Sequence, residues 1–177
     1  MSTEFAIRPP RTMLEVFESL PEGTPMQLIK NNLIMSPAPL DRHQLLSLEL
    51  ASELYQFVKK SKKGTVRYAP YDVYFDDENI FLPDILFVAH ERMKMIKEDG
   101  FHGAPDLVIE ILSPSTAKFD LDDKKKVYER YGVKEYWIID PKQNTATGYC
   151  FVQDKYHEFF KGEGVIESRL LEWRANF

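Results

Sequence analysis

The sequence predicts an α/β protein built on one mixed sheet flanked by helices. Two nearly all-apolar segments, 85–89 and 107–112, are typical of strands that are covered on both faces. Amphipathic helical patterns occupy residues 41–60 and 117–131, on either side of these strands in the chain. From residue 41 the expected order is helix, strand, strand, strand, helix, strand, with a β-hairpin added at each end of the chain.

Length and composition favour an ordinary globular domain spanning 1–177, with 44% hydrophobic and 29% charged residues. We expect an N-terminal helix and hairpin at 1–40, the core at 41–140 and a C-terminal hairpin extension at 141–177. The single cysteine, Cys150, excludes an intramolecular disulfide and fits a reducing compartment. Because no stretch is long and apolar enough to cross a bilayer, we expect a cytoplasmic protein without a membrane partner.

The N-terminal part combines a short helix with a hairpin. Residues 12–20 have apolar side chains at helical spacing, and Pro21 ends the pattern. Residues 26–35 then read as two short strands around Asn31, because asparagine tolerates the positive φ of a tight turn.

The long helix of residues 41–60 is expected to begin with Asp41 as its N-cap. A basic run, 59–63, follows at its end. These lysines suit the negative end of the helix dipole, and a phosphate-contacting patch is the alternative interpretation.

The remaining elements extend the predicted sheet. Residues 65–75 read as one strand with a kink at Pro70, and the polar stretch 91–99 has a helix-like pattern. The helix of residues 117–131 ends before Gly132 and leads into the strand 135–140. The C-terminal hairpin is predicted from two alternating segments, 145–152 and 157–161.

Two carboxylates indicate chemistry. Glu110 interrupts an apolar strand, where a carboxylate is costly unless it is paired, protonated or bound to a cation, and Asp84 opens the other apolar strand. If the strands are neighbours, about 4.8 Å apart, the two acids can converge on one Mg²⁺. Asp106 lies on the same face as Glu110, but four residues of strand put its Cα roughly 13 Å away, so Asp84 is preferred.

A metal-dependent phosphodiesterase also needs a cation beside the attacking water. The position two residues beyond Glu110 is Leu112, so the nearest source is the following helix. On that helix Lys124 falls on a stripe with Asp120 and Tyr128. The alternative is that Lys124 only pairs with Asp120 at i and i+4.

An ordered set of motifs extends over nearly the whole chain. It includes Met35-Ser36-Pro37-Ala38-Pro39 and Pro83-Asp84-Ile85-Leu86-Phe87-Val88. The longest run, from Gly103 to Thr116, reads GAPDLVIEILSPST, and Glu135-Tyr136-Trp137 follows. This set resembles the signature of the Uma-two family of restriction endonuclease-like proteins in the PD-(D/E)xK nuclease superfamily, and it implies that fold.

The resemblance implies a Mg²⁺-dependent endonuclease acting on DNA, with Mn²⁺ able to substitute. Asp84 and Glu110 would hold the ion, the main chain of Ile111 would supply a further oxygen, and Lys124 would be the catalytic lysine, displaced from the strand to the helix. Many nucleases cut duplex DNA as dimers, so we expect a homodimer, for which the C-terminal hairpin offers an interface.

The sequence departs from the family pattern in its N-terminal hairpin. Asn32 stands where the family usually has an acid, and Gln27 also replaces a common acid. Glu49 or Glu53 on the long helix would be substitutes. His43 lies at the start of that helix, where packing or capping is favoured over a role as ligand or base.

Two other functions stay open. The net charge of -5, with 23 basic against 28 acidic residues, disfavours dedicated high-affinity DNA binding. This net charge, together with Asn32 at a position where the family usually has an acid, favours a nuclease fold that has lost catalysis and serves as a binding or assembly module. Hydrolysis of a small phosphodiester or nucleotide is the other alternative, because it needs no basic surface.

Overall fold

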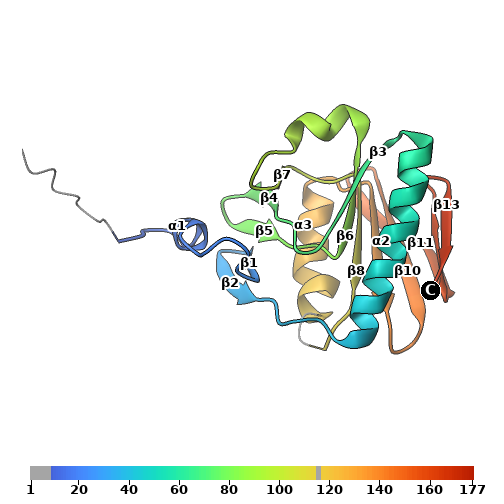
Figure 1. Ribbon diagram of the computed structural model, residues 1–177, viewed down its shortest axis with the longest axis horizontal. Coiled ribbons are helices and arrows are strands. Elements are labelled where there is room, and N and C mark those ends of the chain that lie inside the picture. The colour runs from blue at the N-terminus through green and yellow to red at the C-terminus, as the bar shows by residue number, and fades with distance from the viewer. Residues whose placement is uncertain (1–8, 115–116) are drawn as a thin grey trace, which may run out of the picture.

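A computed structural model describes residues 9–114 and 117–177 as three sheets with helices packed around them (Figure 1). The main sheet has six strands in the order β11-β10-β9-β8-β6-β3. Strands β8 and β9 are parallel, and β6 runs antiparallel to both β8 and β3. The strands of this sheet are β3 (Gly64–Tyr68), β6 (Ile85–Ala89), β8 (Leu107–Ile111), β9 (Glu135–Asp140), β10 (Thr145–Val152) and β11 (Lys155–Glu163).

Two smaller sheets complete the fold. One has five strands in the order β2-β1-β5-β4-β7, and the other pairs β12 with β13. Their strands are β1 (Met26–Ile29), β2 (Asn32–Met35), β4 (Val73–Asp76), β5 (Asn79–Phe81), β7 (Phe101–His102), β12 (Val165–Ser168) and β13 (Trp173–Asn176). The sequence did not predict β5, β7, β12 or β13, because segments this short give little periodic signal.

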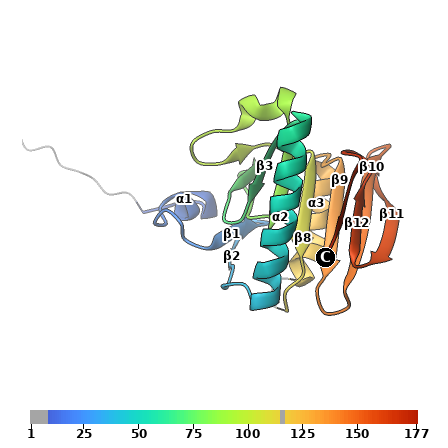
Figure 2. The same ribbon diagram turned by 45° about the vertical axis from the view of Figure 1, so that its right-hand side comes forward.

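Helices lie on both faces of the main sheet (Figure 2). The α-helices are α1 (Met13–Glu18), α2 (Asp41–Ser61) and α3 (Lys125–Arg130). A 3₁₀ helix, η1 (His90–Met95), follows β6, and a π-helix, η2 (Phe119–Lys124), leads directly into α3. No described helix is long and apolar enough to span a bilayer.

The main sheet is covered on both faces, as its apolar strands predict. On one face α2 supplies Leu50 and Leu54, which belong to the same buried cluster as Ile109 and Trp137 of the sheet. On the other face, the five-stranded sheet and α3 contribute to a second cluster that includes Tyr128. Glu110 alternates with Ile109 along β8 and therefore faces this second layer.

The structure corrects four local expectations. The predicted strand of residues 65–75 is two strands, β3 and β4, which belong to different sheets. The helix-like stretch 91–99 is the shorter η1, and the predicted helix of residues 117–131 contains the π-helix η2 before α3. The N-cap of α2 is Leu40 without a side-chain hydrogen bond, and Asp41 is the first helical residue. The C-terminal hairpin is confirmed, because β10 and β11 extend the main sheet.

Candidate active site

The structure brings the two predicted carboxylates together. Ile85 of β6 lies opposite Ile109 of β8, so Asp84 and Glu110 face each other one step further along the ladder. The main-chain N–H of Asp84 donates to Glu110 Oε2 at 3.3 Å. Strand pairing alone therefore places the two acids side by side, at the point where β6 begins and β8 ends.

Glu110 is buried among donors from the following helix. Its Oε1 accepts hydrogen bonds from Tyr128 Oη at 2.6 Å and from Lys124 Nζ at 3.0 Å. Burial raises the pKa of Glu110, and the nearby Asp120 and Asp84 add to the shift, whereas Lys124 opposes it. A divalent cation would favour the ionised form of such an acid.

The π-helix η2 positions the amine. Lys124 is 2% exposed, and its Nζ lies 2.9 Å from Asp120 Oδ1 as well as beside Glu110. The hydroxyl of Tyr136 donates to the main-chain oxygen of Asp120, which ties this wide turn to the sheet. The predicted placement of Lys124 beside Glu110 is thus observed, and the acids on both sides keep its ammonium charged.

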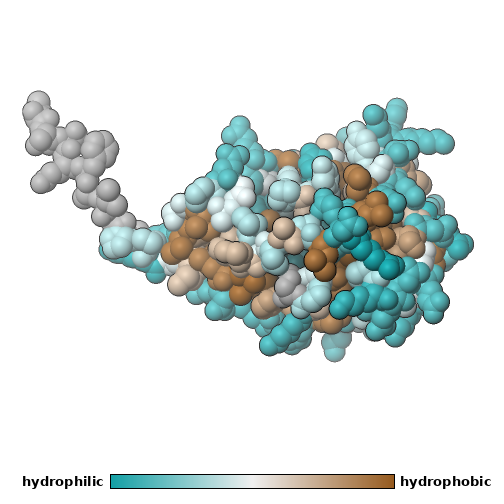
Figure 3. All heavy atoms as spheres, turned by 60° about the horizontal axis from the view of Figure 1, so that its bottom comes forward, coloured by the Kyte–Doolittle hydropathy of each residue, from teal (hydrophilic) through white to brown (hydrophobic). Residues whose placement is uncertain are grey.

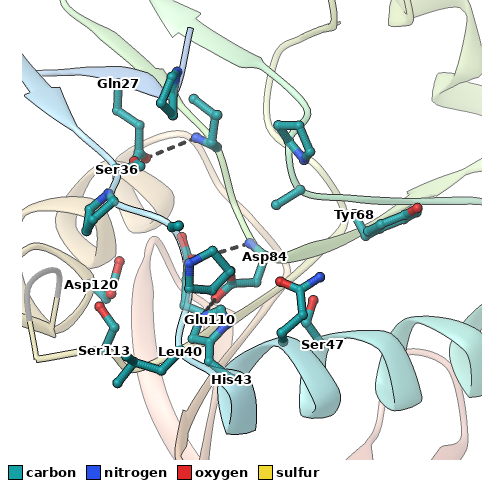
Figure 4. A pocket seen from close by; sticks show the side chains of 18 of the residues that line it. Gln27, Ser36, Leu40, His43, Ser47, Tyr68, Asp84, Glu110, Ser113 and Asp120 are labelled. Atoms are coloured by element: carbon teal, nitrogen blue, oxygen red, sulfur yellow. Dashed lines mark hydrogen bonds and ion pairs between the residues drawn. The ribbon is translucent and has the colours of Figure 1, made fainter. Parts of the chain in front are cut away.

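Asp84 is held by its main-chain and helix neighbours. Its Oδ2 accepts the N–H of Ile111 at 2.7 Å and lies 3.2 Å from His43 Nε2 (Figure 4). Burial alone would lower the pKa of His43, but its hydrogen bond to Asp84 and the charges of Asp84 and Glu110 raise it. His43, in the first turn of α2, orients Asp84 through this contact, which no local sequence pattern predicts.

An open pocket of about 700 Å³ leads to these groups. Its floor contains Asp84, Glu110 and Lys124, and its walls come from the segment before α2, from α2 itself and from the end of β3. Most of the wall residues are apolar or small, among them Pro25, Pro37, Ala38, Pro39, Leu40, Leu48, Ala69, Pro70 and Leu82. Seen from below Figure 1, the surface shows several hydrophobic patches separated by hydrophilic residues (Figure 3).

A family model described as Uma2, putative restriction endonuclease, matches residues 14–176. The chain belongs to the Uma2 family.

The solved structures agree with this assignment. Five solved chains match, among them a crystal structure described as a putative nuclease belonging to DUF820 from Anabaena variabilis. That structure has a TM-score of 0.75 and 25% sequence identity, with 92% of each chain covered. The comparison with curated proteins found no match. This Uma2 chain thus has the family and the fold of a nuclease, which confirms both predictions.

Three other candidate ligands, Asp106, Glu49 and Glu53, lie outside the pocket. Asp106, at the opposite end of β8, accepts the N–H of Ala89 at 2.8 Å and lies 2.8 Å from Lys134 Nζ. Glu49 and Glu53 are on the exposed side of α2. In this Uma2 chain, Asp106 ties strands and loops together, and neither helix acid replaces the missing hairpin acid at the pocket.

The two hairpin departures differ in position. Asn32 donates to the carbonyl of Lys30 within its own turn and is exposed, whereas Gln27 is buried in the pocket wall. Gln27 donates to Ser36 Oγ at 2.7 Å, and its Oε1 accepts the N–H of Leu82. In the sequence, Asn32 is the more conspicuous departure of the two. Successive side chains of a strand point to opposite faces, so Gln27 points away from Leu28, and this alternation is the signal that could have identified Gln27 as the pocket residue.

The donor set fits a hard cation only in part. No group of three His, Cys, Asp or Glu side chains arranged for a metal ion occurs in residues 9–114 and 117–177. Mg²⁺, however, is usually bound by one or two carboxylates, with water and phosphate oxygens completing its octahedron. Asp84 and Glu110 of this Uma2 chain meet that smaller requirement at the floor of an open pocket.

Proposed function

We propose that this protein is a metal-dependent nuclease that hydrolyses DNA phosphodiester bonds at the Asp84–Glu110 site. The observation that carries the proposal is the buried Glu110, held between Lys124 and Tyr128 beside Asp84, on the floor of a pocket open to solvent. A fold needs no such acid for its stability, because a buried ion pair is often no better than apolar packing.

Asp84 and Glu110 would hold the Mg²⁺ or Mn²⁺, with the Ile111 main chain as the neighbouring polar group. Bound there, the ion would lower the pKa of an attacking water molecule and compensate the negative charge on the phosphate. His43 fixes the rotamer of Asp84 through the contact at Oδ2, and Tyr128 fixes that of Glu110. Lys124 contributes a permanent positive charge next to Glu110, where negative charge develops during phosphodiester hydrolysis.

The test pairs calorimetric titration of Mn²⁺ with nicking of supercoiled plasmid DNA. We expect wild-type protein to bind Mn²⁺ and to nick, and Asp84→Asn to lose at least about 100-fold in rate because a ligating charge is removed. Asp122→Asn is the matched control, because Asp122 is exposed on η2 and pairs with Lys126. Equal melting temperatures would show that all three proteins are folded.

One observation favours the second candidate, a degenerate nuclease fold that works as a binding or assembly module. Both oxygens of Glu110 already accept protein hydrogen bonds, and Asp84 Oδ2 accepts that of Ile111. Wild-type protein that takes up neither Mg²⁺ nor Mn²⁺ at millimolar concentration would refute the nuclease and favour this alternative.

A further inference from the structure

We infer that the pocket receives a nucleotide whose base is unpaired, so that the preferred substrate is single-stranded nucleic acid. The inference rests on the proposed function, because it assumes that a phosphodiester lies at Asp84 and Glu110. It follows from the pocket wall beside those acids. This wall is apolar, which suits a nucleobase and not the charged backbone of a duplex.

The wall is apolar and exposed. Leu40, Leu48 and Tyr68 line the pocket with 63%, 61% and 60% of their surfaces accessible. Tyr68 ends β3 and stands at the rim, across the pocket from Leu40 (Figure 4). The faces of a nucleobase are flat and apolar, and stacking on an exposed aromatic ring is the usual way in which proteins hold unpaired bases.

Among the described residues that line the pocket, no basic side chain is available to bind the phosphates of a second strand. Of these described lining residues, the basic ones are Lys124, whose amine is buried between Glu110 and Asp120, and His43, which is paired with Asp84. Duplex binding depends on several Lys or Arg contacts to phosphates. The basic end of α2 is no substitute, because Lys60 lies 17 residues beyond His43, or about 25 Å along the helix.

The size of the pocket points the same way. A volume of about 700 Å³ is that of a small-molecule site, which typically measures about 300–1,000 Å³. One or two nucleotide units fit such a space. In a duplex the faces of the bases are stacked inside the helix, so that neither Tyr68 nor Leu40 can reach them.

The test measures binding without cleavage. Fluorescence anisotropy in EDTA compares a labelled 12-nucleotide single-stranded DNA, the blunt duplex of the same sequence, and the mononucleotide as competitor. We expect the single strand to bind at least about tenfold more tightly than the duplex, and Tyr68→Ala to weaken it by about 5- to 100-fold. Tyr68→Phe should retain binding, because the ring remains.

Tyr55→Ala is the matched control. Tyr55 is 49% exposed on α2 and does not line the pocket, so its loss should leave the affinity unchanged. Displacement of the single strand by the mononucleotide would show that one nucleotide fills the site and would support the inference. Equal or tighter binding of the duplex, or equal effects of Tyr68→Ala and Tyr55→Ala, would overturn it.

Two further results separate this inference from the proposed function. Asp84-dependent nicking without any preference for single strands would sustain the nuclease and overturn the unpaired-base pocket. Single-strand binding that depends on Tyr68, in a protein that never cleaves with Mg²⁺ or Mn²⁺, would refute the nuclease and support the pocket. A dimer that Leu40→Ser and Leu48→Ser both dissociate, seen by light scattering, would show a second copy on this wall and overturn the inference.

Discussion

At the scale of single residues, one position in the pocket wall holds a neutral side chain where an acid would help to bind a cation. Gln27 lies in the pocket wall, where its amide satisfies Ser36 and Leu82. A carboxylate can accept hydrogen bonds from the Ser36 hydroxyl and the Leu82 N–H and adds a charge that attracts hard cations. The identity of this residue is therefore expected to set how strongly the site holds a metal ion.

We predict that Gln27→Glu tightens Mn²⁺ binding by about tenfold, equivalent to about 1.4 kcal/mol, because it adds a carboxylate to the pocket. Isothermal titration measures the change. Asn32→Asp, in the exposed turn outside the pocket, is the control and should leave the affinity as it is. If the control variant shows the larger gain, Asn32 is the position that matters and our assignment of Gln27 is wrong.

A second residue should govern the dependence of stability on pH. Partial burial, together with the nearby charge of Asp99, raises the pKa of Asp72 from its ordinary value of 3.8 to about 6. Between pH 4 and 6 the folded protein therefore retains a proton that the unfolded chain releases. The contribution of Asp72 to the free energy of unfolding falls as pH rises through this window.

We expect Asp72→Asn to be more stable than wild type at pH 7 by about 1 kcal/mol, less than the full pKa shift implies because water screens this half-buried carboxyl, and equal to it below pH 4. Urea unfolding at several pH values measures the difference. Asp77→Asn, in the exposed turn before β5, should follow the wild-type curve. A stabilisation that stays constant from pH 3.5 to 7 would contradict titration of Asp72 as its cause.

At the scale of elements, the main sheet depends on close packing where its C-terminal strands join. The β10–β11 pairing shifts register between Gly148 and Tyr149. A Cβ on Gly148 would lie 2.8 Å from the ring of Trp137, on β9, and 3.0 Å from that of Phe159, on β11. Glycine lets three strands approach here, and a side chain must push an indole ring aside.

We predict that Gly148→Ala lowers the free energy of unfolding by roughly 1–3 kcal/mol, the usual cost of overpacking a core. Thr147→Ala, at the adjacent half-buried position, should cost less than about 1 kcal/mol. Urea unfolding followed by Trp fluorescence reports on both variants. An unchanged midpoint for Gly148→Ala would show that the Trp137 ring has room to move.

At the scale of the whole molecule, the net charge of -5 limits how strongly phosphates are attracted. Affinity for nucleic acid then comes mainly from contacts with the base, and few counterions are released on binding. We predict that raising salt from 50 to 200 mM weakens single-strand binding by less than about tenfold, because roughly two phosphates are contacted. A loss of a thousandfold or more, measured by anisotropy, would reveal a basic surface that this account lacks.

The sequence was a good guide to the central elements. The apolar runs at β6 and β8 predicted strands covered on both faces, because a strand with apolar residues on both sides needs two partners. It also identified Asp84, Glu110 and Lys124 as candidates, since charge in an apolar setting is conspicuous. It did not separate β4 from β3 and missed β5 and β7, which are too short to show a period and form by pairing with neighbouring strands of the five-stranded sheet.

By itself, then, the sequence determined the family, the covered sheet and the acids that lie beside each other, because these follow from local pattern and from one strand pairing. Only the tertiary structure decided which side chains surround those acids. His43, Gln27 and Tyr68 come from three different elements, and their place around one pocket depends on how α2, β1 and β3 pack. Such placement is a property of the whole fold, which no local pattern encodes.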